Sequence, residues 1–205
     1  MAIKPILFNT EMVRAILDGR KTCTRRLVKP QPDEKHTYPL GFVTDSTEKK
    51  KVGRFGFGID EYGGSIQYEK PPYQPGDILY VRETWCKGYL MNAKERYYYK
   101  ADDNDFLCTW HPSTNMPKQA ARIWLRVMDV RVERLQEITA ESALTEGADK
   151  YIHANGTLNE DQTITSFIGI WNSTIKKSDI DRYGWDANPY VWVISFERCE
   201  KPKGV

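Results

Sequence analysis

The feature that most constrains the fold is the long apolar run from Ala121 to Leu135. Its large hydrophobic residues are Ile123, Trp124, Leu125, Val127, Met128, Val130 and Val132. Side chains alternate between the two faces of an extended chain, and these residues occupy both faces. Such a pattern is typical of a strand that is buried on both sides or that bends. The run therefore predicts either a pair of β-strands or one bent strand.

Other segments have the composition and the flanking turns of strands. They are 3–8, 78–85, 97–99 and 190–198, which are rich in β-branched and aromatic residues. Pro75-Gly76-Asp77 forms a turn signal directly before the second of them. Strands are therefore expected to outnumber helices.

Three helices are expected. The first follows Asn9 or Thr10 as N-cap and ends at Gly19. The second lies between Thr139, its N-cap, and Gly147, and the third follows the helical spacing of apolar residues over 164–175. Because short turns connect most strands, this order favours an α+β protein with a small β-barrel and short helices at its ends over a doubly wound sheet.

The chain is expected to form a single domain over residues 1–205, with two likely insertions. The segments 29–72 and 86–118 are polar, proline-containing or glycine-rich, and they interrupt the regular pattern. A hairpin is expected near residues 65–69 in the first of them.

Charge and cysteine usage limit the class of protein. Lys plus Arg number 30 against 28 Asp plus Glu, so a net charge of +2 gives no global signal of polyanion binding, and any such binding must come from local patches. No apolar run approaches the roughly 20 residues of a membrane helix, and no secretory pattern begins the chain, so a cytoplasmic protein without a membrane partner is expected. The four cysteines and three histidines are scattered. Neither a disulfide framework, nor a metal site, nor a cofactor is therefore expected.

A basic cluster lies directly after the first expected helix. Its sequence is Gly-Arg-Lys-Thr-Cys-Thr-Arg-Arg over residues 19–26. Amine, hydroxyl and guanidinium groups in one short segment can hold a phosphate or a polar base and can activate a threonine hydroxyl. The alternative is a solvated basic strand that leaves the helix.

Three segments together resemble the ASCH domain family of the PUA-like superfamily. They are residues 16–26, which resemble the family's Gly-Arg-Lys-Thr-x-Thr-x-Arg signature, then Pro-Gly-Asp-Ile-Leu-Tyr-Val over residues 75–81, and the expected helix over 139–147. The resemblance covers about half of the chain. The extra segments are similar to those of longer ASCH-like proteins, which phages and prophages often carry.

The resemblance implies a PUA-like β-barrel whose cleft suits RNA or a modified nucleoside. Small bacterial members of the family are amidohydrolases that act on N4-acetylcytidine. Their catalytic lysine, threonine and glutamate match Lys21, Thr24 and Glu146 here. The resemblance therefore implies catalytic roles for these three residues.

The chemistry of this trio is consistent on its own terms. Thr24 would be the nucleophile and Lys21 its base, provided that burial or a neighbouring cation lowers the pKa of the lysine. Glu146 would carry a proton to the leaving amine. Residues three apart in an ideal strand point to opposite faces, so the site requires the chain to turn between Gly19 and Thr22.

Glu146 lies at the unfavourable end of its expected helix. A carboxylate in the last turn opposes the helix dipole by up to about 1 kcal/mol. The residue is therefore expected either to be exposed or to be held by a nearby cation.

Further substrate-binding residues are expected beside the trio: Arg20, Thr22, Arg25, Arg26 and Trp85. A second hypothesis is a non-catalytic RNA or nucleotide-binding module, in which basic residues contact phosphates and Tyr80 or Trp85 stacks on a base. A third is a metal-independent ribonuclease. The sequence leaves the oligomeric state and the natural ligand open.

Overall fold

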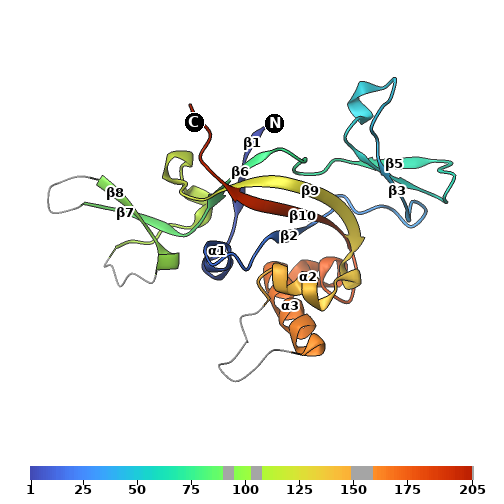
Figure 1. Ribbon diagram of the computed structural model, residues 1–205. Coiled ribbons are helices and arrows are strands. Elements are labelled where there is room, and N and C mark those ends of the chain that lie inside the picture. The colour runs from blue at the N-terminus through green and yellow to red at the C-terminus, as the bar shows by residue number, and fades with distance from the viewer. Residues whose placement is uncertain (90–94, 103–107, 149–158, 205) are drawn as a thin grey trace. The chain divides into compact units, whose positions relative to one another are not determined.

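The computed structural model describes residues 1–89, 95–102, 108–148 and 159–204 (Figure 1). It is a mixed α+β protein with short helices, which confirms the predicted class. The chain divides into two compact units. Unit 1 comprises Met1–Thr22, Pro75–Met128 and Phe196–Val205, and unit 2 comprises Cys23–Gln74 and Asp129–Ser195. The single-domain organisation stays a prediction.

The strands are β1 (Ile3–Leu7), β2 (Cys23–Leu27), β3 (Tyr38–Phe42), β4 (Phe55–Gly58), β5 (Ile66–Glu69), β6 (Ile78–Arg82), β7 (Trp85–Tyr89), β8 (Glu95–Tyr99), β9 (Trp124–Arg134) and β10 (Tyr190–Cys199). The α-helices are α1 (Thr10–Leu17), α2 (Ala140–Thr145), α3 (Glu160–Thr174) and α4 (Ile180–Tyr183). In the part of the chain that is described, no helix combines the length and the apolar character needed to cross a membrane.

The apolar run that was expected to form a strand pair or one bent strand forms a single strand. β9 contains 11 residues, and it begins with the buried Trp124 and Leu125. In unit 1, Leu125 is paired with Leu79 of β6, which runs antiparallel to β9 and parallel to β1. Because successive strand residues project to opposite faces, the burial of both Trp124 and Leu125 means that both faces of the strand are covered where it starts.

The strand that was expected over residues 78–85 is divided in two. β6 ends at Arg82 and β7 begins at Trp85, so the prediction of one continuous strand was wrong. The break accommodates Glu83, whose buried carboxylate accepts two hydrogen bonds of 3.0 Å from Arg122. A buried carboxylate needs such a partner, and Glu83 meets Arg122 at the point where the strand is interrupted.

The exit from α1 has the turn that the basic cluster requires. The Asn9 side chain caps the helix by accepting a hydrogen bond from the N–H of Met12, and Gly19 adopts a left-handed φ of 77°. The backbone N–H groups of Arg20 and Lys21 then both donate to the carbonyl of Ala15. Lys21 therefore belongs to the helix exit, and the strand begins only at Cys23.

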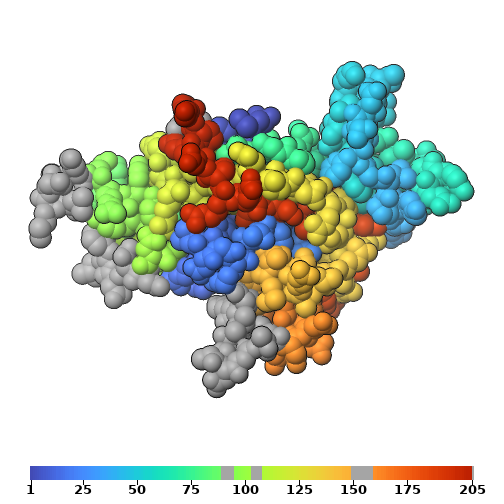
Figure 2. Space-filling view, viewed as in Figure 1, coloured from blue at the N-terminus to red at the C-terminus, as the bar shows by residue number. Residues whose placement is uncertain are grey.

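Unit 2 is built on the antiparallel pair of β2 and β10. Helices α2 and α3 pack against each other (Figure 1), and residues of the two helices form a continuous surface in the space-filling view (Figure 2). Val191 and Val193 of β10 belong to one buried apolar cluster with Phe167 and Trp171 of α3. This cluster fixes α3 against the strands.

Each expected insertion carries a small antiparallel sheet. In the first, β4 pairs with both β3 and β5, and the expected hairpin segment is β5. Phe42 and Phe55 of this sheet pack on Trp192, with ring centroids 6.1 Å apart in both cases. In the described part of the second segment, β7 pairs with β8.

Two of the four cysteines form a disulfide. Cys86 of β7 is bonded to Cys108 at an S–S distance of 2.16 Å, so the expectation of no disulfide was wrong. The two residues are 22 positions apart and belong to no short cysteine motif, and only tertiary structure brings such a pair together.

Candidate anion-binding pocket

Helix α2 brings a carboxylate to the strands of unit 2. The Thr139 hydroxyl caps the helix by accepting a hydrogen bond from the N–H of Ser142, and Gly147 has the left-handed φ of 82° that ends it. Glu146 lies between the helix and this glycine and is only 7% exposed. A carboxylate that is this deeply buried requires a cation.

Arg25 of β2 is that cation. Its guanidinium donates to Glu146 at 3.3 Å, to Glu133 at 3.0 Å and to the Ser142 hydroxyl at 2.9 Å. The Arg25 side chain is 1% exposed. The expectation that a nearby cation holds Glu146 is therefore confirmed, and the exposed alternative is wrong.

One donor of Arg25 is left over. Its Nε–H is buried and has no hydrogen-bond partner among the described residues. An unsatisfied buried donor costs about 1–3 kcal/mol, and native structures tolerate few of them. A bound ligand that accepts a hydrogen bond from this Nε–H would offset the cost.

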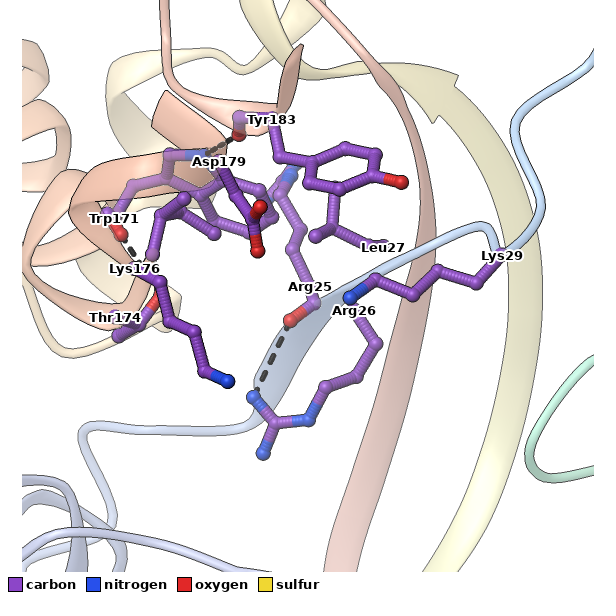
Figure 3. Close-up of a pocket in the computed structure, with 10 residues that line it drawn as sticks. Arg25, Arg26, Leu27, Lys29, Trp171, Thr174, Lys176, Asp179 and Tyr183 are labelled. Carbon is purple, nitrogen blue, oxygen red and sulfur yellow. Dashed lines mark hydrogen bonds between the residues drawn. The ribbon is translucent and has the colours of Figure 1, made fainter. Parts of the chain in front are cut away.

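Arg25 also lines a pocket of about 500 Å³ beside β2 (Figure 3). All ten lining residues belong to unit 2: Arg25, Arg26, Leu27, Lys29, Trp171, Thr174, Ile175, Lys176, Asp179 and Tyr183. They come from β2 and the residues directly after it, from the end of α3 and from the segment that follows α3. β2 is an edge strand that pairs with β10 alone, so neighbouring residues of β2 can both reach this pocket.

Three cationic side chains besides Arg25 line the pocket. Figure 3 shows the guanidinium of Arg26 and the ammonium of Lys176 pointing to the same side of it. Burial lowers the pKa of Arg26 from its ordinary value, although the charge of Glu146 opposes this shift. The Nζ of Lys29 lies 4.9 Å from the centroid of the Tyr183 ring, which holds this lysine at the pocket.

The aromatic wall is fixed by hydrogen bonds within α3 and α4. Trp171 Nε1 donates to the carbonyl of Tyr183 at 2.9 Å, and the Thr174 hydroxyl donates to the carbonyl of Trp171 at 2.8 Å. The first bond ties the end of α3 to the end of α4, and the second lies within α3. Together they fix the part of the pocket wall that these two helices form.

The predicted catalytic residues are all buried. Lys21 is 2% exposed, with its Nζ 5.4 Å from the centroid of the Phe8 ring, and Thr24 is 1% exposed. Thr24 is paired with Ile194 and the next residue, Arg25, with Val193. Because successive strand residues project to opposite faces, Thr24 points away from the face on which Arg25 binds Glu146.

The predicted substrate-binding residues belong to both units. Arg25 and Arg26 line the pocket. Arg20 is bonded to Asp18 at 2.8 Å, and Thr22 is exposed. Trp85 belongs to unit 1, where its ring packs near those of Tyr97 and His111.

Three charged residues of the pocket were not predicted as site residues, namely Lys29, Lys176 and Asp179. Lys29 begins the segment 29–72, which was expected to be an insertion. The signal for the other two was the polar segment Lys176-Lys177-Ser178-Asp179 directly after an amphipathic helix. Nothing in that pattern indicates that it lies beside residues almost 150 positions earlier.

Comparisons with known proteins give one structural similarity. No protein-family model and no curated protein matches the sequence. The fold is similar to a crystal structure of the ASCH domain from Lactobacillus crispatus JV V101, with 10% sequence identity and a TM-score of 0.44. The match covers 96% of this chain and 79% of that chain.

Proposed function

We propose that this protein binds RNA or a nucleotide, and that the pocket beside β2 holds a phosphate group of the ligand. The observation that carries the proposal is the set of three cationic side chains, Arg26, Lys29 and Lys176, around a volume of about 500 Å³. That volume is within the range of small-molecule sites. Arginine and lysine are the side chains that recognise phosphate.

The location of these charges supports a local site. The chain as a whole carries a net charge of only +2, so its surface has no general affinity for polyanions. The basic cluster over residues 19–26, which resembles the ASCH signature, contributes Arg25 and Arg26 to the lining. The sequence resemblance and the charge of the pocket therefore favour the same class of ligand.

The test is the binding of a labelled single-stranded RNA by fluorescence anisotropy at several salt concentrations. For single strands the logarithm of affinity falls with the logarithm of salt by about 0.7 for each phosphate contact. Arg26→Ala and Lys176→Ala should each weaken binding and each reduce this slope by about 0.7.

Lys177→Ala is the matched control, because Lys177 is the exposed neighbour of Lys176 and is not among the residues that line the pocket. It should leave the slope unchanged. Equal effects of Lys176→Ala and Lys177→Ala would contradict a defined pocket. Gel analysis of the same RNA after incubation tests the ribonuclease hypothesis, for which shortened products are required.

Hydrolysis of an amide on a modified nucleoside is the second candidate function. It is favoured by the burial of Lys21 and Thr24, because lysine is seldom buried without a specific role. If the roles implied by the ASCH resemblance hold, the protein releases acetate from N4-acetylcytidine and Lys21→Ala abolishes the release. Lys177→Ala, which changes an exposed lysine outside the predicted site, should retain it. No turnover by the unaltered protein would refute this candidate.

A further inference from the structure

The pocket contains one acidic side chain that a phosphate site does not need. Asp179 ends the short 3-10 helix Lys177–Asp179, and Figure 3 shows its carboxylate directed into the pocket. Its described side-chain hydrogen bond is a long one of 3.4 Å, from the Ser178 hydroxyl. An ionised carboxylate accepts hydrogen bonds and repels phosphate. Its presence therefore indicates that the ligand also brings a hydrogen-bond donor.

The three cations and this carboxylate together favour a ligand that carries both a phosphate group and a nearby hydroxyl group. A nucleotide places hydroxyl groups of its sugar within a few bonds of its phosphate. The ribose 2′-hydroxyl is both donor and acceptor, and it is the group by which proteins distinguish RNA from DNA. Asp179 is half-buried, so water competes less strongly for its carboxylate than it would at a fully exposed side chain.

We propose, building on the proposed function, that the pocket is specific for ribonucleotides, because Asp179 accepts a hydrogen bond from the ribose 2′-hydroxyl while Arg26 and Lys176 hold the phosphate. A deoxyribonucleotide leaves the carboxylate beside the phosphate without a donor. Sites that are built to bind a hydroxyl discriminate against analogues that lack it. Since Asp179 is only half-buried, the expected preference for RNA is about tenfold.

The experiment compares two single strands of about eight nucleotides with identical bases, one of RNA and one of DNA in which deoxyuridine replaces uridine. Affinities are measured by fluorescence anisotropy at one salt concentration with the full chain. The unaltered protein should bind the RNA about tenfold more tightly. In Asp179→Ala the ratio of the two affinities should fall to about one, whether or not both affinities rise from the loss of a negative charge.

Asp181→Ala is the control, since Asp181 is an exposed neighbour that is not among the pocket-lining residues. Its ratio should match that of the unaltered protein. Equal affinity of the unaltered protein for RNA and DNA would overturn ribose recognition and leave the phosphate site standing. A preference that survives Asp179→Ala would overturn the role of Asp179. Binding of neither strand would overturn the proposed function itself.

Discussion

At the scale of single residues, Arg25 determines how unit 2 is held together. Its guanidinium is buried and bonded to two carboxylates, Glu133 and Glu146, that belong to β9 and to the end of α2. A buried ion pair adds little net stability over an apolar substitute, but removal of one partner leaves an uncompensated buried charge. The arginine is therefore far harder to replace than its neighbours.

Arg25→Ala should lower the free energy of unfolding by about 3–5 kcal/mol, because it removes the buried cation to which the Glu133 and Glu146 carboxylates are bonded. Urea unfolding followed by circular dichroism measures this change. Arg20→Ala removes an arginine of the same cluster whose bond to Asp18 is exposed, and it should change the midpoint little. Similar losses for both variants would contradict the role given to Arg25.

At the scale of elements, the sequence predicted those parts of the fold that local chemistry sets. The cap of α2 and the glycines after α1 and α2 follow from residues within a few positions. The sheet of β3, β4 and β5 was seen only as an insertion with a hairpin. Its strands pack through Phe42 and Phe55 onto Trp192, which is a contact that periodicity cannot reveal.

The last residue of β8, Tyr99, supplies a prediction about alkaline pH. The Tyr99 hydroxyl donates to the carbonyl of Ala120 at 2.7 Å, and burial raises the pKa of Tyr99 from 10.0 to about 12, although Arg122 opposes this. Between these two values the unfolded chain loses the proton and the folded chain keeps it. The contribution of Tyr99 to stability is therefore complete below pH 10 and is lost as the pH rises towards 12.

The measurement is the free energy of unfolding across that pH window. It should fall with pH in the unaltered protein and fall less in Tyr99→Phe, which has no proton to lose. The difference between the two proteins isolates Tyr99 from the other tyrosines. Parallel curves would show that Tyr99 has no raised pKa.

The disulfide between Cys86 of β7 and Cys108 gives a prediction that cysteine modification can test. With Cys86 and Cys108 joined, Cys23 and Cys199 are the free cysteines. Alkylation of the unfolded protein without reductant should therefore modify two of the four cysteines, and prior reduction should expose all four. Mass spectrometry gives the count. Disulfides are rare in the cytosol, so four modified cysteines without reductant would contradict the bond and agree with a cytoplasmic protein.

At the scale of the whole molecule, the sequence predicted the class of fold and two of the residues that line the pocket of unit 2. The basic cluster drew attention to Lys21 and Thr24, and it contained two residues of the pocket, Arg25 and Arg26. The other cationic and acidic groups come from Lys29 and from the segment after α3. Their position depends on how α3 packs against β10, and a single sequence does not encode that contact in any short motif.

If the pocket is the RNA-binding site, RNA lies beside β2 and the end of α3. The most direct test is photo-crosslinking of the full chain to a single-stranded RNA that carries 4-thiouridine, followed by mass spectrometry of the digested protein. The account predicts crosslinked peptides from residues 25–29 and 171–183, and their loss in Arg26→Ala. Crosslinks confined to other segments, such as 38–69 or 85–89, would contradict it.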